Sequence, residues 1–390
     1  MATPGMWGLL NLFIKLYGDK LYLLPFKVSI SNKQFLLVPN LSKSRRYLTI
    51  FCAICTFCHT LFCFAVLCKP FFVKDKHEDH SLPGISQTLK IVRIYGQILG
   101  ALYPSAFLAM NYVLAFTPII AQVILCSIAD FQEETKELSA PKLRHPNYFF
   151  VELGMKLMLP FCFFVSIPFA LTAVYLQLDP LFVLSQHTQN IILLFLLRCL
   201  ILVIVAVEAT KATNAFFIIG LMVVCATNDI LRDLTECKVR FNLDLRFQES
   251  HLYIKLFLWN KYTNQNFCTF SVPPLIFFGF SVVVLSYYGT IRMFGKASFL
   301  VYLIIPSLGI LSTLFVIMLI PHGTRVLELS EIFILSRINA TEVSKFERKM
   351  WKSRRPLGTQ VDSFGHAGKS LKILAFKYIA ESTINLLLTF

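Results

Sequence analysis

Charged residues are scarce in this sequence. Asp, Glu, Lys and Arg make up 15% of its 390 residues, whereas a soluble domain usually contains about 25%. Hydrophobic residues make up 56%, and Phe alone occurs 38 times. A soluble fold of this length cannot bury so much apolar surface, but a lipid bilayer can accommodate it. The composition therefore excludes an ordinary soluble protein and predicts one membrane domain.

Motifs of enzymes and of nucleic-acid-binding modules are also absent. The sequence has no His-Glu-x-x-His, Gly-x-Ser-x-Gly or Gly-x-Gly-x-x-Gly motif, no zinc-finger spacing and no run of five basic residues. His77-Glu78-Asp79-His80 contains metal-ligand residue types, but adjacent residues point in different directions and no second ligand group accompanies them. We therefore expect no enzyme, no metal or other cofactor, and no nucleic-acid partner.

Two marks of a secreted domain are missing as well. The first 46 residues lack a long apolar core followed by small residues, so we expect no cleaved signal peptide. Ten of the eleven Cys fall in or beside apolar runs, and only Cys237 lies in a clearly polar segment. Buried Cys behave as small hydrophobic residues. A disulfide framework outside the cell is therefore not expected.

Long apolar runs dominate the rest of the sequence. A transmembrane helix needs about 20 mostly apolar residues. Seven runs qualify: 47–67, 94–128, 157–176, 191–225, 267–288, 298–320 and 371–390. The predicted fold class is all-α, a polytopic membrane protein with an N-terminal segment, 1–46, and a seven-helix membrane domain, 47–390.

Two of these runs, 94–128 and 191–225, are too long for one helix perpendicular to the bilayer. Each is either a tilted helix that projects beyond the bilayer or a pair of crossings. Pro104 and Pro118 interrupt the first run, and no turn signal surrounds Glu208 and Lys211 in the second. We therefore favour projecting helices.

Basic residues predict the orientation of the chain. With the N-terminus in the cytoplasm, the inner segments 1–46, 130–156, 229–266 and 321–368 contain 25 Lys and Arg, against 7 in the outer segments. Cytoplasmic loops are enriched in Lys and Arg, so we predict a cytoplasmic N-terminus and an outer C-terminus. We also expect a multi-pass protein of the plasma membrane. The net charge of +15 then reflects loops that face anionic lipid.

Two inner segments have a helical periodicity of their own. Apolar residues recur at helical spacing over 230–245 and over 327–350, with charged residues between them. Both stretches predict amphipathic helices. Such helices form either a packed cytoplasmic body beneath the spans or a layer on the membrane surface.

Run 191–225 carries three charged residues. Glu208 and Lys211 share one helix face and can neutralise each other. They form either a polar element inside the bundle or at its cytoplasmic mouth, or a salt bridge where the helix leaves the membrane. Arg198, near the outer half, either contacts an anionic or polar ligand or reaches the headgroups.

The last run carries a polar stripe: Lys377, Glu381, Asn385 and Thr389. Residues four apart advance only about 40° around a helix, so these side chains form one slanting line. Ala380, Ile384, Leu387 and Leu388 lie on the other side. Because such a line cannot face lipid cheaply, it faces either water in a pore or transport pathway, or a polar seam between helices.

The C-terminus resembles that of a known family. The sequence ends Ser-Thr-Ile-Asn-Leu-Leu-Leu-Thr-Phe, which is similar to the terminal motif of arthropod gustatory receptors: Thr, usually Tyr, several apolar residues, usually Gln, then Phe. Thr383 and Phe390 match the motif, whereas Ile384 and Thr389 replace its Tyr and Gln. The stretch from Arg354 to Phe364 also looks like the segment that leads into the last helix of that family.

The resemblance implies a ligand-gated cation channel of the superfamily that includes insect odorant receptors. It implies a homo- or hetero-tetramer in which the last helix of each subunit lines the pore, with Glu381, Asn385 and Thr389 along it and a gate at Phe390. It also implies a pocket for a small-molecule tastant or metabolite in the outer half of the bundle. Candidate ligand-binding residues are amphipathic or polar side chains near outer span ends: Tyr103, Tyr175, Gln177, Arg198, Tyr287, Tyr288 and Tyr302. Each Tyr is alternatively a headgroup anchor.

Two other classes compete with this interpretation. A G-protein-coupled receptor would have the opposite orientation, a polar tail after the last helix and an Asn-Pro-x-x-Tyr motif within it, which the sequence lacks. A secondary transporter would have paired halves with matching broken helices, and seven unequal runs do not suggest that pattern.

The predicted orientation can be tested through glycosylation. The sequons Asn40-Leu41-Ser42 and Asn339-Ala340-Thr341 both fall on predicted inner segments, where no glycan is added. We expect no mobility shift on glycosidase treatment of the protein expressed in insect cells. A shift that disappears in Asn339→Gln would contradict the orientation.

Overall fold

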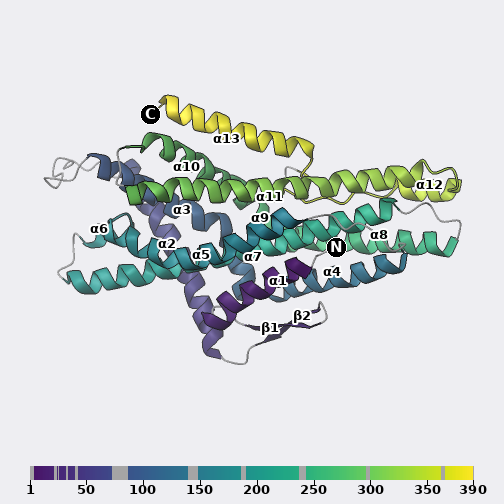
Figure 1. Ribbon diagram of the computed structural model, residues 1–390, viewed down its shortest axis with the longest axis horizontal. Coiled ribbons are helices and arrows are strands. Elements are labelled where there is room, and N and C mark those ends of the chain that lie inside the picture. The colour runs from purple at the N-terminus through teal and green to yellow at the C-terminus, as the bar shows by residue number, and fades with distance from the viewer. Residues whose placement is uncertain are drawn as a thin grey trace.

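Nearly all of the chain that can be described is helical. The computed structural model describes residues 4–21, 24, 26–31, 34–39, 43–72, 87–138, 148–185, 190–236, 243–295, 299–361 and 365–389. Long helices run side by side along the major axis of the molecule (Figure 1). We call one end of this axis the α6 end, where the last helix finishes, and the opposite end the α12 end.

The helices follow the predicted runs closely. The long helices are α2 (Lys43–Phe72), α3 (Gln87–Phe116), α4 (Ile119–Leu138), α5 (Phe149–Tyr175), α7 (Ile191–Glu236), α8 (Leu243–Thr263), α10 (Phe280–Arg292), α11 (Phe299–Ile338) and α13 (Lys369–Thr389). The short ones are α1 (Pro4–Phe13), α6 (Phe182–Ser185), α9 (Thr269–Pro274) and α12 (Lys345–Lys352). Three wide helical turns complete the list. The first continues α1 and is η1 (Ile14–Lys20), and two lie between α8 and α10, η2 (Asn264–Cys268) and η3 (Leu275–Gly279).

Six helical stretches of the described chain are long and apolar enough to cross a membrane: Lys43–Cys68, Arg93–Phe116, Phe149–Tyr175, Ile191–Glu236, Asp244–Arg292 and Tyr302–Ile338. They overlap six of the seven predicted runs. The seventh, α13, has 21 residues, which span about 31 Å at 1.5 Å per residue. It is less apolar because Lys372, Lys377 and Glu381 lie within it.

The two overlong runs resolve differently. Run 191–225 lies within α7, a single helix of 46 residues that extends about 69 Å, so the predicted projecting helix is confirmed. Run 94–128 is two helices, so the single helix that we favoured is wrong there. The chain breaks at Thr117 and Pro118, between α3 and α4. Proline has no N–H and clashes with the preceding turn. Pro104, by contrast, lies inside α3.

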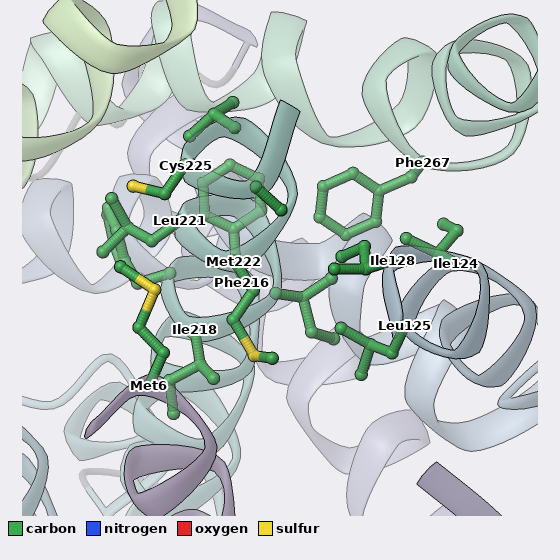
Figure 2. Packing of buried hydrophobic residues seen from close by; sticks show 14 of the residues in the cluster. Met6, Ile124, Leu125, Ile128, Phe216, Ile218, Leu221, Met222, Cys225 and Phe267 are labelled. Atoms are coloured by element: carbon green, nitrogen blue, oxygen red, sulfur yellow. The ribbon is translucent and has the colours of Figure 1, made fainter. Parts of the chain in front are cut away.

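Helix α7 forms the centre of the fold. It contacts α2, α3, α4, α5 and α11, and its middle is buried almost all round. Figure 2 shows Phe216, Ile218, Leu221, Met222 and Cys225 of this helix packed between Met6 of α1 and Ile124, Leu125 and Ile128 of α4. Ala212, Ala215 and Ala226, each 1% exposed or less, let neighbouring backbones approach closely.

The N-terminal segment is part of this core. Met6, Leu10 and Tyr17 are buried, and α1 contacts α5 and α7. The Tyr17 hydroxyl accepts a hydrogen bond from Asn214 Nδ2 of α7 at 3.1 Å. A segment predicted to precede the membrane domain therefore packs inside it.

The same segment contains a β-hairpin, so the all-α prediction is wrong there. Strands β1 (Phe26–Ser31) and β2 (Gln34–Pro39) pair antiparallel, with Phe26 opposite Pro39 and Ser31 opposite Gln34. The hairpin lies beside α4 (Figure 1). Val28, Ile30 and Val38 are β-branched, and such residues favour strands.

The α12 end is a packed body, as one of the two amphipathic interpretations predicted. Tyr253 of α8 stacks on Phe333 of α11, and both rings contact Trp351 of α12. Arg337 forms a buried ion pair with Glu249. The second stretch, 327–350, covers the end of α11 and most of α12. The first continues α7 to Glu236 and begins α8 at Leu243, and residues 237–242 lie outside the described residues.

Helix α12 begins with a reciprocal cap. The backbone N–H of Glu347 donates to Ser344 Oγ at 3.2 Å, and the backbone N–H of Ser344 donates to Glu347 Oε2 at 2.8 Å. Burial raises the pKa of the Glu347 carboxyl, but the hydrogen bonds from Ser344 and the charge of Arg246 outweigh it, so this pKa is lowered. The cap is therefore most stable above the ordinary carboxyl pKa and weakens as the pH falls through the lowered value.

The Glu208 and Lys211 pair is buried inside the bundle rather than at a helix exit. Lys211 Nζ lies 2.7 Å from Glu208 Oε1, and each side chain is 1% exposed. Of the two alternatives left open by the sequence, the structure selects the polar element inside the bundle.

We expect Lys211→Met to lower the free energy of unfolding by roughly 3–5 kcal/mol, because Glu208 would remain as a buried charge without its cation. The double variant Glu208→Gln, Lys211→Met should recover most of this loss. Thermal denaturation in detergent measures both, with Lys349→Met, at an exposed lysine, as control. If the thermal unfolding midpoint of Lys211→Met equals that of the control, the Glu208–Lys211 pair contributes nothing to stability.

Candidate functional site

Helix α13 lies at the edge of the bundle and touches it through one narrow face (Figure 1). Its buried residues are Ala375, Ile379 and Thr383. The first two pack with Phe280 and Val283 of α10 and Val316 of α11. The Thr383 hydroxyl donates to the backbone oxygen of Ile379 at 2.7 Å, so this residue of the C-terminal motif faces the bundle.

The polar stripe of α13 faces away from the bundle. Residues two apart lie about 200° apart on a helix, so the buried line through Ile379 and Thr383 is opposite the stripe. The side chains of Lys377 and Glu381 are 62% and 60% exposed, with Nζ and Oε1 3.6 Å apart. Asn385 and Thr389 are also exposed. Phe390, the candidate gate, lies outside the described residues.

Apolar side chains flank the stripe. Ile373, Leu374, Ile384 and Leu388 are between 54% and 81% exposed. The helix therefore presents both a polar line and apolar flanks to its surroundings, and the rest of the described chain covers neither.

The candidate ligand residues do not converge on one pocket. Tyr103 of α3 lies deep in the bundle, where its hydroxyl is 3.2 Å from Thr213 Oγ1 of α7. Tyr175, at the end of α5, is 78% exposed and points away from the interior. The remaining candidates divide between the interface of α10 with α11 and a charged cluster at the α6 end.

Three tyrosines occupy the interface of α10 with α11. The Tyr287 hydroxyl is 2.6 Å from Thr313 Oγ1, and Tyr302 donates to the backbone oxygen of Thr290 at 3.1 Å. Tyr288 and Tyr302 pack against a small cluster around Tyr95 of α3. Sequence reasoning missed Tyr95, whose hydroxyl donates to the Leu285 carbonyl. Gly289 permits this approach, since a Cβ there would lie 2.6 Å from the Tyr95 hydroxyl.

Arg198 and Gln177 belong to the charged cluster at the α6 end. Arg198 Nε donates to Asp179 Oδ2 at 2.9 Å, and the Asp179 side chain is fully buried. Arg93 of α3 donates to the carbonyl and to Oε1 of Gln177 at 3.0 and 3.1 Å. Both guanidinium groups lie over the Phe182 ring, at 4.4 and 5.2 Å. The cluster fixes the connection between α5 and α7 onto α3.

Asp179 and Arg93 were missed because they lie outside the apolar runs, and no spacing in the sequence pairs them. The Arg198 side chain is engaged with Asp179 and with the Val174 carbonyl.

An apolar cavity of about 120 Å³ lies deeper in the bundle. It is bounded by α3, α7, α10, α11 and the wide turns η2 and η3, and Tyr103 lines it together with many Phe residues. Phe217 stacks on Phe315 with centroids 3.5 Å apart, and Phe216 stacks on Phe267 at 5.7 Å. The abundance of Phe was visible in the sequence, but the pairing of rings from separate helices was not.

No group of three or more His, Cys, Asp or Glu able to hold a metal occurs among the described residues. The His77 to His80 stretch lies outside them. No protein-family model matches the chain, and no curated protein matches its sequence.

Solved structures do match the chain. The insect olfactory receptor OR5 from Machilis hrabei in complex with eugenol aligns with a TM-score of 0.62 over 99% of this chain and 100% of that chain, at 13% identity. The structure of the same receptor described without eugenol aligns with a TM-score of 0.61 over 98% and 99%, at 14% identity. This chain has the insect olfactory receptor fold. The predicted helical, multi-pass architecture is thereby confirmed at the level of fold, and both of these neighbours are structures of one olfactory receptor.

We expect Arg198 and Asp179 to be energetically coupled. Arg198→Ala leaves a buried carboxylate without its cation, and Asp179→Ala leaves a buried guanidinium without its anion, so each should lower the melting temperature. The double variant should be less destabilised than the sum, with a coupling of roughly 1–3 kcal/mol. Additive effects in a double-mutant cycle in detergent would contradict the coupling.

Proposed function

We propose that this protein is a gustatory-type chemoreceptor of the plasma membrane, a ligand-gated, non-selective cation channel whose pore is lined by α13. One observation carries the proposal. The described part of the chain leaves the polar stripe of α13 uncovered, in a fold shared with an insect olfactory receptor whose structure holds a small molecule.

The stripe requires a polar surrounding that one chain does not supply. Within a bilayer, polar groups are satisfied by protein or by water. Copies arranged around a closed symmetric axis place four such stripes along one aqueous path. The C-terminal motif at Thr383 and Phe390 favours the gustatory branch of this superfamily, and with it the tetramer. The face of α13 that is buried against the bundle carries Ile379 and Thr383 and lies opposite the stripe, so the stripe is free to line that path.

The orientation belongs to the same proposal. The distribution of Lys and Arg favours a cytoplasmic N-terminus, which places the α12 end in the cytoplasm and the α6 end outside. Exposed apolar residues at the α12 end, among them Ile332, Leu335 and Phe346, then provide contacts between subunits in the cytoplasmic body.

For the ligand, we propose an apolar small molecule with few polar groups. Pockets for such ligands are mostly apolar with a few placed polar side chains, and Tyr103 with its hydroxyl beside Thr213 fits this description. Tyr287, Tyr288 and Tyr302 are further candidate ligand-binding residues. Arg198 and Gln177 instead fix the connection between α5 and α7, so they act by positioning that connection and not by touching the ligand.

Alanine substitution of Tyr103, Tyr287, Tyr288 and Tyr302 should shift ligand sensitivity, since each removes a ring and a hydroxyl from the interior. Concentration–response curves of ligand-evoked current in a heterologous cell measure the shift. Tyr175→Ala is the matched control, because Tyr175 is 78% exposed. Unchanged sensitivity in all four variants at normal surface expression would place the pocket elsewhere.

The pore and gate have separate tests. Asn385→Ala and Thr389→Ala should alter relative ion permeability more than ligand sensitivity, because these side chains lie on the stripe. Phe390→Ala should raise current without ligand, since four large apolar rings near one axis form a poorly wetted constriction. Leu374→Ala, on an exposed apolar flank, is the control. If the stripe variants reach the surface with unchanged permeability, α13 does not line the pore.

Assembly is tested independently of current. Mass photometry of the purified protein in detergent should show a species of four subunits. A monomer that conducts after reconstitution would contradict the tetramer.

A further inference from the structure

A second cavity lies where the helical bundle meets the body at the α12 end. Its volume is about 440 Å³, within the range of about 300–1,000 Å³ usual for ligand pockets. Helix α8 forms one wall, and the segment that leads from α12 to α13 forms the other. We call it the basic cavity, because Lys261, Arg354, Arg355 and His366 line it.

Within the described part of the chain, no acidic side chain neutralises the charges of the basic cavity. No Asp or Glu is among the described residues that line it. Lys261 and Arg355 are exposed and form no ion pair within the described part of the chain. The Nε–H of Arg354 is buried without an acceptor among the described residues. A buried donor without an acceptor is costly, and an anion in the cavity would supply one.

Backbone hydrogen bonds hold the segment that forms the floor of the cavity. Ala367 N donates to the Thr359 carbonyl at 2.8 Å, and Val361 N donates to the Gly365 carbonyl at 2.7 Å. Gly365 has a φ of +85°, which favours glycine. Asn260 and Asn264 of the opposite wall both donate to the Gly358 carbonyl, at 3.1 and 2.9 Å. These bonds fix the backbone at 358–361 and 365–367 against α8, beside the basic cavity.

The basic cavity adjoins the apolar cavity. Asn260 and Asn264 line both, just before the apolar run that begins at Phe267. The apolar cavity continues from there past Ile276, Val316 and Ile320. A cationic space at the edge of a membrane-spanning run thus sits beside an apolar space within the bundle.

From this juxtaposition we propose that the two cavities together bind an anionic phospholipid. Its phosphorylated headgroup occupies the basic cavity, held by Arg354, Arg355 and Lys261, and an acyl chain enters the apolar cavity. Basic pockets on the cytoplasmic side of membrane proteins recognise phosphorylated headgroups in this way. A soluble phosphate compound would use the basic cavity alone, whereas the adjoining apolar space favours the lipid.

The site has a position suited to regulation. The segment that forms its floor runs directly into α13, and Leu371 of α13 lines the apolar cavity. If α13 lines the pore, which rests on the function proposed above, a bound lipid contacts the base of the pore helix. Binding itself does not depend on that function.

The test uses the purified full-length protein and native mass spectrometry, so it requires no current. Phosphatidylinositol bisphosphate is compared with phosphatidylcholine, with phosphatidylserine and with soluble inositol trisphosphate. We expect the bisphosphate lipid to bind most tightly. The variant Lys261→Gln, Arg354→Gln, Arg355→Gln should lower its affinity by more than about tenfold, because each basic residue near an anionic headgroup contributes.

The matched control removes three positive charges from α12, outside both cavities: Lys345→Gln, Lys349→Gln, Lys352→Gln. It should change lipid affinity less than about twofold, since general attraction falls off with distance. Equal loss in both triple variants, or none in the cavity variant, would overturn the proposal. So would inositol trisphosphate binding as tightly as the lipid, which would indicate a site for soluble polyphosphates. Should the cavity variant not fold, Arg355→Glu, at an exposed side chain, must lower lipid affinity for the proposal to stand.

Discussion

The burial of α7 is the constraint on which the rest of the structure depends. A helix of 46 residues whose middle is enclosed on all sides needs neighbours in every direction, and α2, α3, α4, α5 and α11 supply them. Alanines on α7 bring these neighbours close, and stacked rings such as Phe217 on Phe315 fill the wider gaps. The N-terminal segment also packs in this core, where the Tyr17 hydroxyl accepts a hydrogen bond from Asn214.

Polar groups within this apolar structure are placed in three different ways. Glu208 and Lys211 neutralise each other inside the bundle. Arg198 and Asp179 do so at the α6 end and, with Arg93, tie a connection to α3. The stripe on α13 is different, because its residues are left at the surface of the chain. Polar side chains that a fold does not satisfy internally point to an environment outside the single subunit, which is why α13 carries the functional argument.

The two cavities also differ in how apolar and charged side chains are placed. The apolar cavity lies in the heart of the bundle, while the basic cavity lies at its edge, and Asn260 and Asn264 separate them. Both adjoin the segment before α13. In these proposals the ligand occupies the Tyr103 side of the apolar cavity, and the acyl chain of the lipid enters the same cavity from its Asn260 and Asn264 side.

The sequence by itself determined the membrane class, six of the spans, the single projecting helix at 191–225 and the polar stripe of the last helix, because hydropathy and helical spacing are local properties. It also predicted the packed body at the α12 end as one of two interpretations. Sequence did not show the hairpin at Phe26–Pro39, the break at Pro118 or the burial of α1, since prolines and mixed segments behave according to what they pack against. The partners of Arg198, the separation of the tyrosines into different places and the meeting of Lys261 with Arg354 were decided only by the tertiary structure. Arg198 and Asp179 are 19 positions apart, and Lys261 and Arg354, which line one cavity, are more than 90 apart. No local pattern encodes such pairs.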